Sequence, residues 1–107
     1  MAFYELRQYK VLPGQMAAWL ALMEGEIIPF QVSKGMVING SFRHETDESI
    51  YFWIRRFESE EHREKLYKAV YESDFWKESI SPKIPALLDR SAMVVQRIVA
   101  TSLSAMQ

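Results

Sequence analysis

Apolar and polar residues follow two periodicities along this chain, and together they predict alternating strands and helices. Four stretches have the alternation or the composition of β-strands, at residues 3–10, 36–44, 50–57 and 92–99. Apolar side chains at helical spacing predict one helix over residues 15–28, and a second helix is expected from residue 60 to about residue 71. A short helical segment follows at residues 73–77. The predicted order is therefore β-α-β-β-α-β.

Prolines, glycines and one serine set the expected limits of these elements. Pro13–Gly14 marks the turn after the first strand. Pro29 should end or kink the first helix, because proline lacks a backbone donor and its ring clashes with the preceding turn. Gly40 lies near the middle of the second strand, where glycine signals a bulge or a close backbone approach. Ser59 is a good N-cap for the second helix.

This order of elements is that of a ferredoxin-like α+β fold, a four-stranded antiparallel sheet with both helices on one face. We expect residues 1–107 to form a single domain. The strand at residues 50–57 is bulky on both faces, which is typical of a central strand that is covered on both sides. Because the helices cover only one face, a homodimer formed through the sheet faces would supply the missing layer.

Composition narrows the classes of function. With 49% hydrophobic and 25% charged residues, the chain resembles an ordinary globular protein. Its net charge of −1 and its lack of basic runs predict no general affinity for nucleic acid. No apolar run approaches the length of a membrane span, and we expect no signal peptide. The chain has no cysteine, which excludes disulfides and cysteine nucleophiles and fits a cytoplasmic location.

The first strand carries an unusual polar face. Glu5, Arg7 and Tyr9 occupy every second position, so their side chains point to the same side of the strand. Two interpretations are open. The three residues could form an ion pair and a hydrogen bond within the sheet. Alternatively, Arg7 could bind a carboxylate, phenolate or enolate of a small molecule, while Glu5 fixes the guanidinium and Tyr9 donates a hydrogen bond.

The third strand adds three more candidates. Tyr51, Trp53 and Arg55 share one face, and this strand neighbours the first in a ferredoxin-like sheet. All six side chains would converge if the two faces point the same way. Taken alone, each aromatic residue is better explained as part of the core, and it is the convergence that indicates a pocket. Arg55 could pair with Glu5 across the strands, or it could add a second positive charge for an anionic ligand.

Few other residues suggest chemistry. His44 and His62 are the only histidines, and a metal site would need at least three ligands placed together, so no metal or other cofactor is predicted. His44 is either a general base or a solvated side chain. Trp19 and Trp76 are expected to anchor helices, although Trp76 could also close over a pocket.

The opening "YELRQYKVLPG" is similar to the first strand and turn of NIPSNAP family proteins, which follow Tyr-Glu-x-Arg-x-Tyr with Pro-Gly. The resemblance continues through "IYFWIRRF" and the Asp-x-Trp segment at residues 74–76, and it covers nearly the whole chain. It implies a subunit of a dimeric α/β barrel, with paired sheets inside and helices outside. That superfamily includes cofactor-free monooxygenases of aromatic polyketides, haem-degrading enzymes and isomerases, and in several of these the pocket lies between sheet and helices. Where haem-degrading relatives would carry an axial histidine, this chain has Ser79, Ile80 and Ser81.

Three hypotheses of function follow. The first is a homodimer that binds a small anionic or aromatic metabolite in a pocket between sheet and helices, with Glu5, Arg7, Tyr9, Tyr51, Trp53 and Arg55 as binding residues. The second is a cofactor-independent monooxygenase or isomerase, in which an arginine stabilises a developing anion. The third is a non-catalytic module whose outer helices dock a protein partner. The fold permits all three, and no catalytic residue is assigned.

Overall fold

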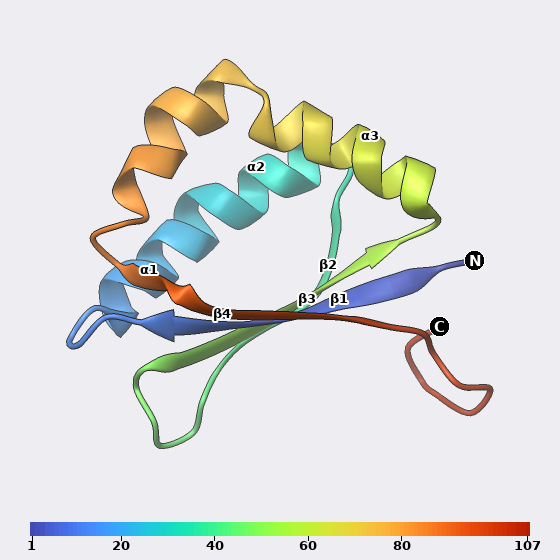
Figure 1. Ribbon diagram of the computed structural model, residues 1–107, viewed down its shortest axis with the longest axis horizontal. Helices are drawn as coiled ribbons and strands as arrows, with labels where there is room; N and C mark the ends of the chain where they lie inside the picture. The colour runs from blue at the N-terminus through green and yellow to red at the C-terminus, as the bar shows by residue number, and fades with distance from the viewer.

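The computed structural model describes all 107 residues, and it consists of one sheet covered on one face by helices (Figure 1). The strands are β1 (Phe3–Val11), β2 (Val37–Arg43), β3 (Ile50–Phe57) and β4 (Leu88–Ile98). They pair antiparallel in the order β2-β3-β1-β4. This is the strand order of a ferredoxin-like fold, so the predicted fold class is confirmed. No helix is both long enough and apolar enough to cross a membrane.

Of the two outcomes expected at Pro29, an end or a kink, the end is wrong, because the first helical segment runs through Pro29 to Ser33. It consists of α1 (Met16–Leu22), a π-helical turn at Met23–Ile27 and α2 (Ile28–Ser33). The backbone N–H of Ile28 donates to the carbonyl of Met23, five residues earlier. Pro29 then falls in the first turn of α2, where its missing N–H costs little. The wider turn therefore lets the chain pass a proline without leaving the helix.

The second helix begins and ends as predicted. It is α3 (Glu60–Tyr71), and the backbone N–H of His62 donates to the hydroxyl of Ser59 over 3.1 Å, which confirms Ser59 as the N-cap. A π-helical turn at Trp76–Ile80 and a short 3-10 turn at Ser81–Lys83 follow and lead into β4.

Irregular pairing explains two further features of the sheet. The register of β2 against β3 shifts between Ile38 and Gly40, as the glycine predicted, and a Cβ atom at Gly40 would collide with the ring of Phe42. β4 begins at Leu88, four residues before the predicted start at residue 92. The register of β4 against β1 also shifts, between Gln8 and Lys10. A bulge disturbs the alternation of side chains, which is why the sequence pattern recognised only the later part of β4.

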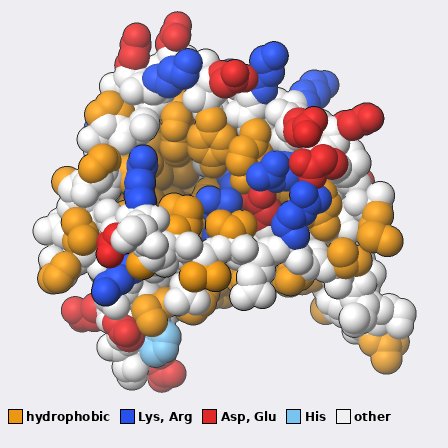
Figure 2. Space-filling model, viewed as in Figure 1, with side chains coloured by type: hydrophobic (Ala, Val, Ile, Leu, Met, Phe, Trp, Pro, Cys, Tyr) orange, Lys and Arg blue, Asp and Glu red, His pale blue; other side chains and the backbone are white.

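Two groups of buried side chains lie between the sheet and the helices. The larger group is Tyr9, Val11, Trp19, Leu22, Met23, Ile27, Tyr51, Trp53, Ile80, Ile84 and Leu88. The smaller group is Phe3, Met36, Phe57, Leu66 and Val70. The layer between sheet and helices is not completely filled. Figure 2 shows a hollow in this layer, lined by hydrophobic side chains, with charged side chains beside it.

No helix covers the opposite face of the sheet, and only the C-terminal segment reaches one end of it, where Thr101, Ser104 and Met106 line a small pocket with Tyr4, Ile54 and Ile98. Leu6 and Ile54 lie opposite each other on β1 and β3 and are half-buried. Phe42, Val94 and Ile98 extend this apolar surface along β2 and β4 and are exposed. We call these five residues the outer sheet face. Helices cover only the other side, as the sequence predicted (Figure 1).

Candidate functional site

The pairing of β1 with β3 places all six predicted residues on the face of the sheet that the helices cover. Glu5 lies opposite Arg55, Arg7 opposite Trp53, and Tyr9 opposite Tyr51. The side chains that alternate with these six along the strands point the other way and belong to the outer sheet face. Two strands that are distant in sequence therefore bring three facing pairs of side chains together beneath the helices.

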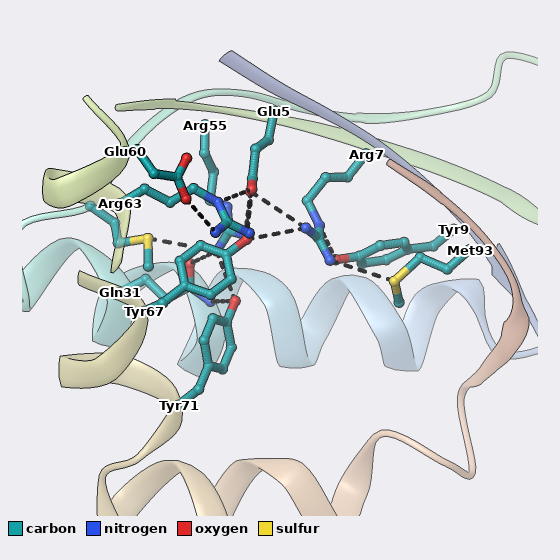
Figure 3. Close-up of polar contacts among 11 residues, drawn as sticks. Glu5, Arg7, Tyr9, Gln31, Arg55, Glu60, Arg63, Tyr67, Tyr71 and Met93 are labelled. Carbon is teal, nitrogen blue, oxygen red and sulfur yellow. Dashed lines mark hydrogen bonds and ion pairs between the residues drawn. The ribbon is translucent and has the colours of Figure 1, made fainter. Parts of the chain in front are cut away.

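The carboxylate of Glu5 is the centre of a buried polar network (Figure 3). Its Oε1 atom accepts hydrogen bonds from Arg55 Nη2 at 2.8 Å and from the hydroxyl of Tyr67 at 2.6 Å. Its Oε2 atom accepts from Arg63 Nε at 2.7 Å. The side chain of Arg55 is 0% exposed and that of Glu5 only 1%. The sequence left open whether Arg55 pairs with Glu5 across the strands, and in the structure it does.

Arg55 is held through both of its terminal nitrogens, while its Nε atom is buried without an acceptor. Its Nη1 atom donates to Gln31 Oε1 at 2.9 Å and to the hydroxyl of Tyr71 at 2.8 Å. Its guanidinium also lies over the ring of Trp53, 4.5 Å from the centroid. Arg55 therefore links the sheet to α2 and α3 through hydrogen bonds to Gln31 and Tyr71.

The Glu5 network makes stability depend on pH. Burial raises the pKa of Glu5, but the hydrogen bond from Tyr67 and the positive charges of Arg55, Arg63 and Arg7 outweigh it and lower the pKa from 4.5 to about 2. Because the pKa is lower in the folded state, the stabilisation is complete above pH 4.5 and is lost as the pH falls towards 2. It amounts to something on the order of 3 kcal/mol.

We therefore expect Glu5→Gln to be less stable than the wild type near pH 7, with a gap that narrows as the pH falls from 4.5 towards 2. Urea unfolding of both proteins at several pH values measures the gap. Glu64→Gln is the matched control, because Glu64 is exposed on α3 and should leave the pH dependence unchanged. A gap that stays constant over this range would show that Glu5 is not held ionised by the arginines.

Arg7 is held differently from Arg55. Its Nε atom donates to the hydroxyl of Tyr9 at 2.8 Å, while its Nη1 atom lies 3.4 Å from Glu5 Oε1. Its Nη2 atom has only the sulfur of Met93, at 3.5 Å. A thioether is a weak acceptor. The guanidinium of Arg7 thus has no short contact with a carboxylate, although its side chain is only 14% exposed.

A cavity of about 380 Å³ lies next to Arg7, between the sheet and the helices. Eleven of its fourteen lining residues are hydrophobic. Six of the lining residues are aromatic, namely Tyr9, Trp19, Trp53, Tyr67, Tyr71 and Trp76. Arg90, which is exposed, also lines it. The arrangement offers an apolar chamber with a buried positive charge in its wall, which suits a small molecule that has an anionic group and an apolar body.

Three of the six predicted residues line this cavity and three do not. Arg7, Tyr9 and Trp53 are in its wall. Glu5 and Arg55 lie behind the wall as a buried ion pair. Tyr51 packs in the core, where its hydroxyl is hydrogen-bonded to Ser41. No group of three His, Asp or Glu side chains is placed to hold a metal ion.

Comparison with known proteins decides the family. A model of the NIPSNAP family matches residues 4–103. The chain belongs to the NIPSNAP family. The resemblance carried by the opening strand is thereby confirmed. No curated protein matches the chain.

Solved structures agree with this assignment. A NIPSNAP family protein from Agrobacterium tumefaciens is 19% identical, with a TM-score of 0.87 over 100% of both chains. Another from the same organism, of unknown function, is 25% identical, with a TM-score of 0.88 over 99% of this chain and 94% of that one. A candidate antibiotic biosynthesis monooxygenase from Caulobacter crescentus is 16% identical, with a TM-score of 0.69 over 94% of this chain and 90% of that one. This last likeness is one of fold.

Helix α3 supplies the residues of this NIPSNAP site that the sequence analysis missed. Arg63, Tyr67 and Tyr71 are spaced four residues apart, so they form one stripe along the helix. The stripe faces the sheet and reaches Glu5 and Arg55. The spacing itself is a signal that could have been found, because a row of one arginine and two tyrosines is not the pattern of a solvated helix face.

Proposed function

We propose that this NIPSNAP protein binds a small molecule with an anionic group and an apolar body in the cavity between its sheet and helices. The guanidinium of Arg7 carries the proposal. Its nearest carboxylate, Glu5, is 3.4 Å away and already accepts shorter hydrogen bonds from Arg55 and Arg63. A buried positive charge whose one carboxylate is shared with two closer arginines is only partly compensated, and an anionic ligand would complete the compensation.

The charges around Glu5 support the same conclusion. Three guanidinium groups, those of Arg7, Arg55 and Arg63, surround one carboxylate. Arg63 has a second acidic neighbour in Glu60, at 3.5 Å. Both terminal nitrogens of Arg55 donate to Glu5 or to neutral acceptors, and only its Nε atom is left without a partner. Arg7 is therefore the arginine of this cluster whose positive charge is least compensated by carboxylates, and it is also the one that lines the cavity.

Tryptophan fluorescence tests the proposal directly, because all three tryptophans of the chain line the cavity. We expect saturable changes in emission when the protein is titrated with apolar carboxylates such as phenylacetate, 4-phenylbutyrate and octanoate. Native mass spectrometry of the protein as purified would detect a natural ligand that stays bound. The proposal is wrong if none of these carboxylates binds at millimolar concentration and no small molecule is carried through purification.

We also propose that the protein forms a homodimer through the outer sheet face. This face joins half-buried Leu6 and Ile54 to exposed Phe42, Val94 and Ile98, and no helix covers it; only the C-terminal segment lies against one end of it, beside Ile54 and Ile98. The occupant that fits best is a second copy, because two such sheets present the same apolar surface to each other. The dimeric barrel expected from the sequence has this arrangement.

Ile54→Lys should convert the dimer to a monomer, since it places a charge at the centre of the proposed interface. Light scattering after size-exclusion chromatography measures the mass of each variant. Ala69→Lys is the matched control, because it adds the same charge at an exposed position of α3. A monomeric wild type, or an Ile54→Lys variant that stays dimeric, would contradict the proposed interface.

Catalysis without a cofactor is a second candidate function. It is favoured by the structural likeness to the candidate monooxygenase from Caulobacter crescentus, which covers 94% of this chain. The buried guanidinium of Arg7 could stabilise an anion that develops on an activated aromatic or enol substrate. The same ligands, with activated phenols and enols added, would be followed by mass spectrometry after incubation in air. Consumption that requires the protein would support catalysis, and unchanged ligand in every case would favour simple binding.

A further inference from the structure

We infer that the cavity selects ligands whose head group only accepts hydrogen bonds, such as the carboxylate of an apolar acid, and that it rejects the corresponding amides and amines. This inference rests on the proposed function, since it specifies the class of ligand for the same cavity. It follows from an inventory of the donors and acceptors around Arg7.

The strong acceptors near the cavity are already occupied. Both oxygens of Glu5 accept hydrogen bonds, from Arg55 and Tyr67 on one side and from Arg63 on the other. Glu5 is buried and does not line the cavity. The side-chain oxygen of Gln31, also fully buried, accepts from Arg55. A ligand that brings N–H groups finds no free carboxylate or amide oxygen here.

The tyrosines divide into two kinds. The hydroxyl of Tyr67 donates its proton to Glu5. The hydroxyl of Tyr71 accepts from Arg55 Nη1 at 2.8 Å and from Gln31 Nε2 at 3.2 Å, and it donates to no protein atom. The hydroxyl of Tyr9 accepts from Arg7 Nε at 2.8 Å and likewise donates to none. Tyr71 and Tyr9 both line the cavity, and neither hydroxyl proton has an acceptor in the protein, so both are available to a ligand that reaches them.

Further donors belong to the same wall. Arg7 Nη2 has only the sulfur of Met93 as partner, at 3.5 Å. Ser81 is the one lining residue with a hydroxyl that makes no hydrogen bond to the protein, so it can both donate and accept. The Tyr9 oxygen accepts only from Arg7, so it too has room for one more donor. The cavity therefore presents a guanidinium and two phenol protons against two neutral hydroxyl oxygens and no free carboxylate or amide oxygen.

This imbalance discriminates between otherwise similar ligands. A carboxylate has about four acceptor sites and no donor, so it can take Arg7 Nη2 and a tyrosine hydroxyl together. A carboxamide of the same shape brings two N–H groups that would lose their water partners and gain only neutral hydroxyl oxygens, those of Ser81 and Tyr9. An ammonium group would also be repelled by Arg7. Since a site built around one hydrogen-bonding pattern strongly rejects another, we expect at least ~100-fold discrimination.

Matched ligands test this on the full chain. We would titrate 4-phenylbutyrate, 4-phenylbutyramide and 4-phenylbutylamine and follow the emission of the three tryptophans. The acid should bind at least ~100-fold more tightly than the amide, and the amine should not bind. If the acid and the amide bind within about threefold of each other, the proposed function stands and this inference is overturned. If none of the three binds, the inference is overturned together with the proposed function for this ligand class.

Two variants test the source of the selectivity. Tyr71→Phe removes a free hydroxyl proton, so it should weaken binding of the acid about tenfold and leave any binding of the amide unchanged. Tyr51→Phe is the matched control, because Tyr51 does not line the cavity and its hydroxyl is hydrogen-bonded to Ser41; it should leave the binding of the acid unchanged. Tyr9→Phe provides a second test of a free hydroxyl. Equal affinity of the acid for the wild type, Tyr71→Phe and Tyr9→Phe would overturn the assignment of the tyrosine protons.

Discussion

Arg55→Met should lower the free energy of unfolding by about 3–5 kcal/mol, because it leaves the carboxylate of Glu5 buried without its shortest arginine contact on Oε1. It also removes the donor for Gln31 and Tyr71, which belong to α2 and α3. Methionine is unbranched and adaptable, so most of the loss should come from the polar network and not from a cavity. Urea unfolding followed by circular dichroism measures the change.

The stability of Arg7→Met should be compared with that of Arg55→Met. Arg7 lies on the same face of the sheet, on β1, and contacts the same carboxylate, but at 3.4 Å, and its Nη2 atom has no acceptor other than the sulfur of Met93. Removing its charge should therefore change the stability by less than about 1 kcal/mol. If both variants lose the same stability, Arg7 is a structural residue like Arg55, and the case for an anion site beside it fails.

Arg7→Met should at the same time weaken the binding of 4-phenylbutyrate by about 100-fold, the second large effect that we expect. A charge-assisted hydrogen bond to a carboxylate contributes about 1.5–3 kcal/mol, and the long-range attraction of the guanidinium adds to it. Isothermal titration calorimetry measures both the affinity and the enthalpy. The enthalpy should become less favourable as the hydrogen bond is lost.

Arg90→Met provides the matched control for this loss. Arg90 also lines the cavity, but it is exposed, so solvent screens its charge. Its replacement should change the affinity by less than about threefold. A larger loss in Arg90→Met than in Arg7→Met would place the anionic group of the ligand at the entrance and would contradict the role of Arg7.

The sequence predicted the arrangement of Glu5, Arg7 and Tyr9 because a strand has only two faces. Its alternation put these residues on one side, and the order of elements made the first and third strands neighbours. It could not decide between an ion pair and a binding site. The structure contains an ion pair in Glu5 and Arg55 and leaves Arg7 beside a cavity, so the two interpretations apply to different residues of the same face.

Other features were beyond local patterns. Pro29 usually ends a helix, but a π-helical turn of five residues absorbs it here, and hydropathy alone does not encode that turn. The contribution of Tyr67 and Tyr71 depends on how α3 is laid across the sheet, which is a property of packing. The cavity likewise depends on where bulky side chains fail to meet. The homodimer, the cytoplasmic location and the lack of a cofactor stay predictions.

A crystal structure of the protein with bound 4-phenylbutyrate tests the central claim most directly. We predict that a carboxylate oxygen lies within hydrogen-bond distance of Arg7 Nη2, in place of the sulfur of Met93, and that the phenyl ring lies among the aromatic residues of the cavity. Ligand density only at Arg90 or on the outer sheet face, with Arg7 still against Met93, would contradict the claim that Arg7 is the anion-binding residue of this cavity.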